Sequence, residues 1–436
     1  ALNRERVRVE VEWLIHLTSY AVVPGVRALT TAEQAALRGV VECFGPSDIA
    51  ELAEIERVTV HDVKAVEYYL KKRLTAIAPD PTDAGLAELI HFACTSEDIN
   101  NLAYALMVKG AVEQVWLPRA TGLVEQLSEM ARDLAEVPLL AHTHGQPATP
   151  TTMGKELAVA AFRLRRQLAR VSGTAYLGKF NGATGTYGAH LAAVPDHDWQ
   201  ATSRAFVEGL GLAWNPLTTQ IESHDWQAEV YADMARFNRI LHGLAVDVWT
   251  YISKGYFAQV RGQGTVGSST MPHKVNPIRF ENAEANLEVS TALLDVLGST
   301  LVESRMQRDL TDSSMQRNIG TAFGHSLLAI DNVCRGLSGL DAVPVAMAAD
   351  LDSNWEVLAE PIQSAMRALA ARGVEGMDSP YERLKELTRG RRIGADDLRD
   401  FIGGLGLPED VSARLQAMTP QSYVGLAPSL VRHLDG

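Results

Sequence analysis

Apolar residues in the middle of the chain recur at alternating spacings of three and four positions. Shorter series of this kind begin at Leu157 and Leu287, and a less regular one leads into Ile330. A mean spacing of 3.5 residues sustained over several turns is typical of long helices packed nearly parallel in a bundle. We therefore predict an all-α fold with a core of long bundled helices. The longest series consists of Val230, Met234, Phe237, Leu241, Leu244, Val248 and Tyr251.

A further long helix is predicted over residues 97–136, with Pro118 producing a kink rather than an end. Shorter helical patterns on either side indicate three domains. We predict a helical N-terminal domain over residues 1–93, the long-helix bundle over 94–341 and a small helical C-terminal domain over 342–436. The glycine-rich stretch 173–220 suits loops and a hairpin inserted between bundle helices.

Composition narrows the class of protein. The 436 residues are 46% hydrophobic and 21% charged, an ordinary globular balance. The net charge of -13 argues against nucleic-acid binding, although a local basic cluster could still bind a small anion. Three widely spaced cysteines predict neither disulfides nor a zinc site. No apolar run is long enough for a membrane helix or a signal peptide, so we expect a soluble, cytoplasmic protein.

The stretch GSSTMPHKVNP, residues 267–277, is small, polar and braced by prolines. Asn276 followed by Pro277 predicts a helix start, with asparagine as N-cap and proline at the first helical position. The free N–H groups of that helix would lie beside Ser268 and Lys274, an arrangement suited to anion binding. A linker with a good cap is the alternative interpretation.

A second stretch of similar design is AHTHGQPATPTTMGKE, residues 141–156. Thr149 and Pro150 predict another helix start, preceded by His142 and His144. No further ligands follow at a suitable spacing, so we expect no metal site. A histidine near a helix N-terminus tends to be neutral, which suits proton transfer near pH 7.

Two other stretches are open to a structural interpretation. In HFACTSEDINN, residues 91–101, Thr95 or Ser96 is predicted to cap a helix whose first turn holds Glu97 and Asp98. Taken alone, this stretch favours helix capping over a functional role. His61, on a short amphipathic helix, is by default a structural histidine. The segment 304–318 is rich in arginine and serine, which suits either a solvated surface or a phosphate.

Taken together, these stretches indicate a function more clearly than each does alone. Three predicted helix starts beside basic or hydroxyl residues, with an arginine and serine cluster, are consistent with a site for a polyanion. Histidine, serine and lysine without any cofactor motif indicate proton-transfer chemistry. We therefore expect an enzyme that needs no cofactor.

The loop GSSTMPHKVNP resembles the signature loop of the fumarase/aspartase superfamily. Within that superfamily, HFACTSEDIN, HTHGQPATP, TTQIE and QRDLTDSS are similar to the adenylosuccinate lyases of enteric and related bacteria, over almost the whole chain. The resemblance implies a lyase that eliminates fumarate from adenylosuccinate, giving AMP, and from the succinylocarboxamide ribotide of purine synthesis. It also implies a homotetramer with active sites shared between subunits.

The resemblance implies a role for each matching position. Ser268 would be the general base that takes the proton from the succinyl carbon. His144 would be the general acid that protonates the departing nitrogen, with Glu281 orienting its imidazole. Lys274 and Asn276 would hold the substrate carboxylate as it becomes a dianion. The substrate and its phosphate would be bound by His61, Asp62, His91, Thr95, Ser96, Gln220, Arg308, Ser313 and Arg317.

The sequence departs from the family pattern at a few positions. Val60 stands where the family carries asparagine, and His142 where it carries arginine. The family also has an N-terminal segment, with an Arg-Tyr pair that contacts the phosphate, ahead of the position of Arg4.

Two other classes of protein stay open on the residues alone. One is another fumarate-releasing lyase, acting on argininosuccinate or aspartate, and the arginines near 308 and 317 argue against it. The other is a non-catalytic helical scaffold, against which the intact Ser268, His144, Lys274 and Glu281 speak.

Helix length bears on assembly. Thr95 lies at the start of the predicted helix over 97–136, and His144 lies beyond its far end. At 1.5 Å per residue, a helix of that length would separate them by roughly 60 Å. We therefore expect one pocket to take Thr95 and His144 from different chains.

Overall fold

The computed structural model describes residues 1–80, 84–260, 271, 274–388 and 393–435. This part of the chain divides into two compact units, each assembled from separate stretches of sequence. Unit 1 consists of Ala1–Pro118, Ala169–Ala235 and Thr291–Phe323, and unit 2 consists of Arg119–Leu168, Arg236–Ser290 and Gly324–Gly436. The three domains predicted from the sequence, with boundaries near residues 93 and 341, are continuous stretches, whereas these units each combine separate ones. Those boundaries therefore stay a prediction.

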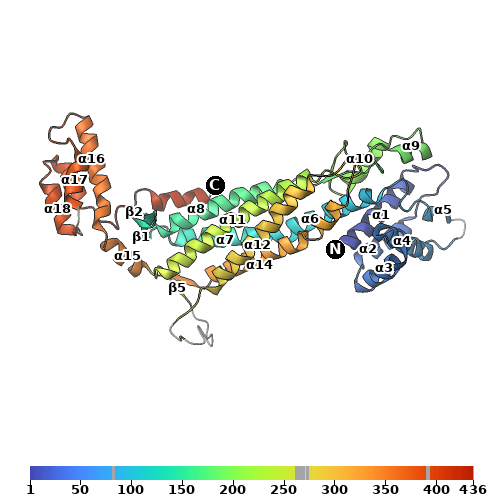
Figure 1. The fold of residues 1–436 in the computed structure, drawn as a ribbon, viewed down its shortest axis with the longest axis horizontal. Coiled ribbons are helices and arrows are strands. Elements are labelled where there is room, and N and C mark those ends of the chain that lie inside the picture. Colours follow the sequence, from blue (N-terminus) through green and yellow to red (C-terminus); the bar gives the residue numbers. More distant parts are fainter. Residues whose placement is uncertain (81–83, 261–270, 272–273, 389–392, 436) are drawn as a thin grey trace. The chain divides into compact units, whose positions relative to one another are not determined.

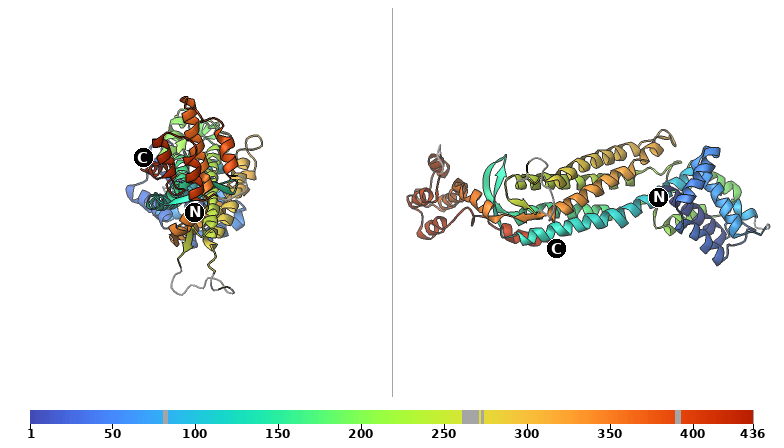
Figure 2. Two further views of the ribbon diagram at one scale, coloured as in Figure 1. Left: turned by 90° about the vertical axis from the view of Figure 1, so that its left-hand side faces the viewer. Right: turned by 90° about the horizontal axis from the view of Figure 1, so that it is seen from below.

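Five long helices contribute residues to both units (Figure 1). Their bounds are Leu117–Asp133 for α7, Met153–Ser172 for α8, Asp225–Ser253 for α11, Ile278–Leu301 for α12 and Ile319–Leu337 for α14. Within unit 2, the parts of these helices that belong to it run side by side (Figures 1 and 2). The predicted bundle of long helices is therefore confirmed.

The predicted apolar series faces the interior of the bundle. In α11, Val230, Met234, Phe237, Leu241 and Val248 are all buried. The spacing of three and four positions therefore marks the packed side of the helix, as expected for an amphipathic helix in a bundle.

The remaining elements of unit 1 are mostly short helices, and α1–α4 cluster together at the blue end of the chain (Figures 1 and 2). An aromatic centre made by Trp13, Phe180 and Phe206 packs α1 against later segments, with ring centroids 4.4–5.0 Å apart. The elements are α1 (Leu2–Ser19), α2 (Thr31–Glu42), α3 (Pro46–Thr59), α4 (Asp62–Ile77), α5 (Ala84–Ala87), α6 (Ser96–Ala111), η2 (Val112–Trp116), β3 (Leu177–Gly178), α9 (Gly188–Ala193), α10 (Trp199–Gly209), β4 (Ala213–Trp214) and α13 (Thr311–Gln316).

Unit 2 adds two antiparallel strand pairs, β1 with β2 and β5 with β6, and a group of C-terminal helices. Leu351, Leu358 and Met366 belong to a buried apolar cluster that holds these helices together. The elements are β1 (Pro138–Thr143), β2 (Gln146–Thr152), β5 (Phe257–Gln259), β6 (Leu340–Ala342), α15 (Pro344–Asp352), η3 (Trp355–Leu358), α16 (Ala359–Ala371), α17 (Pro380–Thr388), α18 (Ala395–Gly403), α19 (Glu409–Gln416), α20 (Ala427–Leu430) and η4 (Val431–Leu434).

The helix predicted over 97–136 is present as α6, η2 and α7, which follow one another without interruption. The five residues of η2 form a π-helical turn immediately before Pro118. A proline ring crowds the carbonyl of the preceding turn, and a wider turn is one way a helix accommodates it. Pro118 therefore lies within a continuous helical run, as predicted.

The prediction of a helix start at Thr149 and Pro150 is wrong. Those residues belong to β2, which pairs antiparallel with β1, and α8 begins only at Met153. The β-branched threonines favour extended backbone, and prolines are tolerated at the edge of a strand, so the segment suits a hairpin.

Two smaller expectations also need correction. The helix after the signature loop begins at Ile278, one residue later than predicted. Instead of a hairpin in the glycine-rich stretch 173–220, Leu177–Gly178 pairs in parallel with Ala213–Trp214.

Close packing in unit 2 requires a glycine at position 154. A Cβ there would lie 2.2 Å from the carbonyl oxygen of Ala131 and 2.5 Å from the amide nitrogen of Ala135, both rigid backbone atoms. Gly154→Ala should therefore lower the free energy of unfolding by about 1–3 kcal/mol, the usual cost of overpacking. Denaturant unfolding measures this change.

Gly243 provides a matched control in α11. A Cβ at this exposed helical position meets nothing within 4 Å. Gly243→Ala should raise the free energy of unfolding by up to about 1 kcal/mol, because alanine is the better helix former. Equal stabilities of the two variants would contradict the packing argument.

Candidate active site

Unit 1 contains all the residues predicted to bind the substrate except Asn276, which belongs to unit 2. They come from the starts of α4 and α6, the segment before α11 and the region around α13. The residues are His61, Asp62, His91, Thr95, Ser96, Gln220, Arg308, Ser313 and Arg317.

His61 is the N-cap of α4 rather than a residue within the helix. Its Nδ1 accepts a hydrogen bond from the Lys64 amide at 3.2 Å, and its Nε2 lies 3.5 Å from Ser96 Oγ. Because Nδ1 accepts, the neutral ring carries its proton on Nε2, directed toward Ser96. The structure thus brings two predicted substrate-binding residues together.

The residue before this cap is strained. Val60 ends α3 in the left-handed conformation with φ 53°, and its side chain is 87% exposed. A β-branched residue adopts this conformation at a steric cost that asparagine largely avoids. Valine in place of the asparagine of the family therefore introduces backbone strain next to His61.

Asp62 is held by an arginine from α1. Arg6 donates from Nη2 to Asp62 at 2.6 Å and from Nε to Asn100 at 2.8 Å. Burial raises the pKa of Asp62, but Arg6 and the Val63 amide more than offset this and hold the pKa below its ordinary value. Asp62 is therefore a charged, fixed acceptor at the start of α4.

His91 is paired with a carboxylate that is completely buried. Its Nδ1 lies 2.6 Å from Glu10 Oε1, and Glu10 also accepts the His91 amide at 3.0 Å. Burial lowers the pKa of His91, but the bond to Glu10 together with the charges of Glu10, Glu67 and Asp98 more than offsets this and raises it. The pair favours a cationic imidazole, which suits a negatively charged substrate.

The start of α6 is fixed by an ion pair that has no exposure to solvent. Asp98 lies 2.8 Å from Lys179 Nζ, and both side chains are 0% exposed. The Asp98 carboxylate also accepts the amides of Thr95 at 2.8 Å, Asn181 at 3.0 Å and Gly182 at 3.1 Å. The pair therefore sets the position of Thr95 and Ser96 relative to the glycine-rich segment.

Arg308 is the centre of a second cluster in unit 1. Its Nη1 donates to Gln220 at 3.3 Å, its Nη2 donates to Ser313 at 3.3 Å, and Nη2 also forms an ion pair with Glu97 at 2.9 Å. Its Nε is buried and has no hydrogen-bond acceptor among the described residues. Three predicted residues thus converge here, and the guanidinium keeps N–H groups that none of these contacts uses. Arg317 is exposed, just after α13.

Unit 2 contains the residues predicted to perform the chemistry. His144 and Gly145 form the two-residue turn between β1 and β2, with φ 52° and 71°. Two positive φ values mark the turn type that suits a tight hairpin. The structure therefore presents the exposed His144 side chain from a defined turn, rather than from the start of a helix.

The other predicted catalytic residues lie near the start of α12. Lys274 is exposed and Asn276 is partly buried. Glu281, in the first turn of α12, accepts a hydrogen bond from Trp249 at 3.2 Å. Ser268 lies outside the described residues.

His142 does not form a pair with His144. Its Nδ1 lies 3.1 Å from the Leu140 carbonyl and its Nε2 lies 2.9 Å from Lys254 Nζ, so it is the neutral tautomer with its proton on Nδ1. Among the described residues, no group of three histidine, cysteine or acidic side chains could hold a metal ion.

The predicted site residues thus fall into two sets that belong to different compact units. Between His144 and Glu281, both of which the structure describes, there is no hydrogen bond or ion pair. The predicted support of His144 by Glu281 is therefore not seen within one chain.

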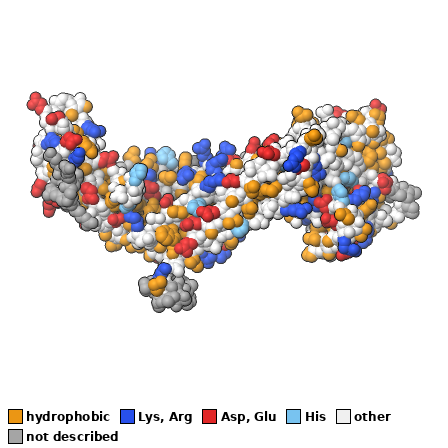
Figure 3. Space-filling view, in the orientation of Figure 1, with side chains coloured by type: hydrophobic (Ala, Val, Ile, Leu, Met, Phe, Trp, Pro, Cys, Tyr) orange, Lys and Arg blue, Asp and Glu red, His pale blue; other side chains and the backbone are white. Residues whose placement is uncertain are grey.

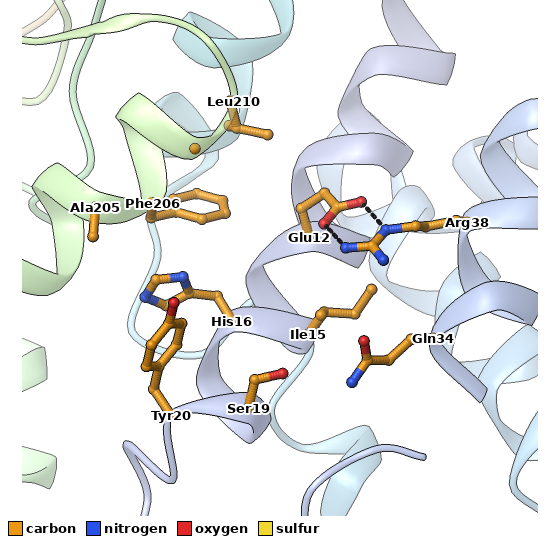
Figure 4. A pocket seen from close by; sticks show the side chains of 11 residues that line it. Glu12, Ile15, His16, Ser19, Tyr20, Gln34, Arg38, Ala205, Phe206 and Leu210 are labelled. Atoms are coloured by element: carbon orange, nitrogen blue, oxygen red, sulfur yellow. Dashed lines mark hydrogen bonds and ion pairs between the residues drawn. The ribbon is translucent and has the colours of Figure 1, made fainter. Parts of the chain in front are cut away.

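A separate cavity in unit 1 contains none of the described site residues. It has a volume of about 310 Å³, with the ion pair of Glu12 and Arg38 on one side and His16, Tyr20 and Phe206 on the other (Figure 4). Both nitrogens of a bidentate bond from Arg38 go to Glu12, at 2.7 and 2.8 Å. The two charges neutralise each other, so the cavity is poorly suited to a phosphorylated substrate.

Figure 3 shows acidic and basic side chains over much of one face, with a group of basic side chains gathered at its upper middle. In the described residues, no helix is both long and apolar enough to cross a membrane.

Comparison with known proteins settles the family. A family model described as lyase matches residues 2–290, and one described as adenylosuccinate lyase C-terminal matches residues 304–424. The adenylosuccinate lyase of Escherichia coli K12 is 49% identical over 433 residues, covering 99% of this chain and 93% of the relative. The chain belongs to the adenylosuccinate lyase family.

Other members are almost as similar to this lyase. The adenylosuccinate lyase of Vibrio cholerae is 47% identical over 434 residues, with 99% of this chain and 93% of the relative covered. That of Haemophilus influenzae is 46% identical over 434 residues, with 100% and 93% covered. The chain is therefore an enzyme of the lyase class.

Solved structures agree on the fold. A fumarate lyase from Mesorhizobium sp. BNC1 superposes with a TM-score of 0.77 at 19% identity, covering 99% of this chain and 94% of that one. A 3-carboxy-cis,cis-muconate lactonizing enzyme from Pseudomonas putida gives a TM-score of 0.72 at 21% identity, with 99% and 93% covered. At these identities the likeness concerns the fold alone.

Sequence reasoning missed several residues of this lyase that hold the site in place. Glu97 and Asp98 were interpreted as first-turn carboxylates of a capped helix, yet both are buried and paired with basic residues far along the chain. The sequence signal for their burial was a pair of adjacent acidic residues followed by apolar ones. Sequence spacing does not identify their partners, Arg308 and Lys179. Glu10 and Arg6, on α1, belong to no sequence motif that would have pointed to them.

Asp98→Asn should destabilise the protein by about 3–5 kcal/mol, because it leaves the charge of Lys179 buried and unpaired. Asp98→Asn with Lys179→Met removes both charges and should recover most of that loss. Denaturant unfolding of the two variants measures the difference.

The exposed ion pair of Glu208 with Arg204, at 2.9 Å in the same unit, is the matched control. Glu208→Gln should change the free energy of unfolding by less than about 1 kcal/mol. A loss of similar size for Glu208→Gln and Asp98→Asn would contradict the role given to the buried pair.

Proposed function

We propose that this lyase eliminates fumarate from two intermediates of purine synthesis. Adenylosuccinate would give AMP and fumarate, and the succinylocarboxamide ribotide would give its carboxamide and fumarate. In each case a proton leaves the succinyl carbon, a carbon–carbon double bond forms, the carbon–nitrogen bond breaks and the nitrogen gains a proton. No cofactor is needed, since no electrons are exchanged with a redox partner.

Ser268 is proposed as the base for the first proton. A serine hydroxyl is a poor base in water, so it must be ionised where water is excluded and hydrogen-bond donors are present. Lys274 and Asn276 are proposed to hold the carboxylate beside the reacting carbon. Each preorganised donor at such a developing charge contributes roughly 3–4 kcal/mol by analogy with oxyanion holes.

His144 is proposed as the acid for the departing nitrogen. A positioned acid of this kind accelerates a reaction by about a hundredfold to ten-thousandfold. The hairpin turn supports this assignment, because it leaves the imidazole exposed while the flanking strands fix its backbone. Glu281 is proposed to orient that imidazole in the assembled enzyme.

The observation that best supports a nucleotide substrate is the cluster around Arg308. Its guanidinium is oriented by Gln220 and Ser313, and its Nε has no acceptor among the described residues. An arginine with a free N–H beside a serine suits a phosphate oxygen. Argininosuccinate and aspartate carry no phosphate, so a lyase for either would gain nothing from this arrangement.

We also propose that the enzyme is a homotetramer whose active sites combine residues of different subunits. The helical run from Ser96 to Asp133 has no break, and it separates Thr95 from the hairpin of His144 along the chain. Large apolar side chains are exposed on the long helices, among them Phe162 at 58% and Trp249 at 41%. Exposed apolar surface of this kind suits contact with other subunits.

The enzyme is proposed to work in the cytoplasm. Its three cysteines are free thiols at distant positions, namely Cys43, Cys94 and Cys334. Unpaired cysteines are usual in a reducing compartment.

Incubation with candidate substrates tests the proposed function. Fumarate, followed by its ultraviolet absorbance, should form from adenylosuccinate and not from argininosuccinate or aspartate. Ser268→Ala should abolish turnover and change substrate affinity by less than about tenfold, because the hydroxyl removes a proton rather than anchoring the substrate. Fumarate from argininosuccinate or aspartate alone would point to the alternative lyases, and none from any substrate to a non-catalytic scaffold.

Complementation tests the sharing of sites between subunits. His144→Ala and Ser268→Ala should each be inactive, and dissociating and reassociating a mixture of the two should restore part of the activity. Recovery is expected because some sites in mixed tetramers would receive both intact residues. If mixed tetramers, verified by mass spectrometry, stay inactive, the two residues act from the same subunit.

A further inference from the structure

A buried carboxylate competes for the arginine that is proposed to bind phosphate. Glu97, in the first turn of α6, is 3% exposed, and its Oε1 lies 2.9 Å from Arg308 Nη2. The same oxygen accepts a hydrogen bond from Asn100 at 2.8 Å. Glu97 thus has a fixed orientation and one strong partner, and the proposed function assigns it no role.

The surroundings of this ion pair are rich in buried charge. Asp312, at the start of α13, is 7% exposed, and its carboxylate lies 3.5 Å from the buried His224. Burial raises the pKa of Glu97, Arg308 lowers it, Asp312 raises it, and the net pKa is above the ordinary value. Arg308 is therefore already paired with Glu97, and its charge also acts on the carboxylate of Asp312, before any ligand arrives.

We propose that Glu97 is a positioning residue that aims Arg308 at the nucleotide phosphate and at the same time limits how tightly that phosphate is held. This proposal rests on the proposed function, in which Arg308 binds the phosphate. The ion pair of Nη2 with Glu97 adds to the hydrogen bonds to Gln220 and Ser313 in fixing the guanidinium plane, so that the remaining N–H groups have a defined direction. The negative charge of Glu97 opposes the charge of an arriving phosphate, which carries close to two negative charges at neutral pH.

Such a counter-charge has a consequence for turnover. AMP and the carboxamide product both keep the phosphate of their substrates. An arginine whose full charge is available would therefore bind product as tightly as substrate. Binding that is equal in the ground state and the transition state does not raise the turnover rate. Glu97 therefore moderates an interaction that substrate and product have in common.

Two substitutions separate positioning from moderation. Glu97→Gln keeps the shape and an oxygen acceptor for Arg308 but removes the charge, so the affinity for AMP should rise by about tenfold. Glu97→Ala removes the acceptor as well, so Arg308 keeps only its contacts with Gln220 and Ser313, and the affinity for AMP should fall below that of Glu97→Gln. Neither substitution should change the affinity for adenosine by more than about twofold, because adenosine lacks the phosphate.

Calorimetric titration of the intact oligomer with AMP and with adenosine makes the comparison. Glu12→Gln is the matched control, because it removes a carboxylate charge from an ion pair in the same unit, at 2.7 Å from Arg38 and outside the predicted site. Its affinities for both ligands should equal those of the parent protein. The difference between AMP and adenosine is the decisive quantity, since a general loss of structure would weaken both.

Arg308→Ala distinguishes a failure of this inference from a failure of the proposed function. It should weaken AMP binding by tenfold or more and leave adenosine unchanged, and Glu97→Gln should have no further effect on AMP in its presence. If Arg308→Ala binds AMP normally, the assignment of Arg308 to the phosphate is wrong. If Arg308→Ala loses AMP but Glu97→Gln leaves the affinity unchanged or weakens it, the role of Glu97 is overturned while the proposed function stands.

Discussion

A fully buried ion pair, Asp98 with Lys179, holds together two stretches of unit 1 that are distant in sequence. Neither charge reaches water, so each is tolerated only because the other is present. Asn101 completes the junction, since its side chain bonds both the amide and the carbonyl of Lys179, at 2.8 and 3.0 Å. The glycine-rich segment fixed in this way then offers the Ala183 carbonyl to Gln220 at 2.9 Å. The start of α6 and the residue that contacts Arg308 thus depend on one electrostatic junction.

The charges in unit 1 form two groups with different tasks. The pair of Asp98 with Lys179 has no exposure to solvent and sets the backbone at the start of α6. His91 and Arg308, whose side chains are 20% and 21% exposed, each pair with a buried carboxylate and are themselves reached by solvent. A binding site for a charged substrate needs both, because donors can be preorganised only when their support does not itself rearrange.

The fold was largely predictable from the sequence, because a stripe of apolar residues every three or four positions has few solutions other than long packed helices. The buried series in α11 shows this. The hairpin before α8 was missed, since Thr149 followed by Pro150 suits a helix start as well as a strand edge, and only pairing with β1 decides between them. For the site, resemblance supplied the residues that are proposed to contact the substrate. Supporting residues such as Glu97 and Lys179 escaped, because their roles come from partners that only the folded chain brings near.

The tight turn that carries His144 acts as a filter on which side chains can evolve at that position. With φ at 52°, the backbone excludes β-branched residues and disfavours most others, whereas histidine, asparagine and aspartate are tolerated far better. Of those three, only histidine has an ordinary pKa close to neutrality. The steric restriction by the hairpin and the chemistry of the proton donor proposed at this position therefore favour the same amino acid. A longer loop at this hairpin would no longer require a positive φ at position 144. Only the pKa needed for proton transfer would then restrict the amino acid there.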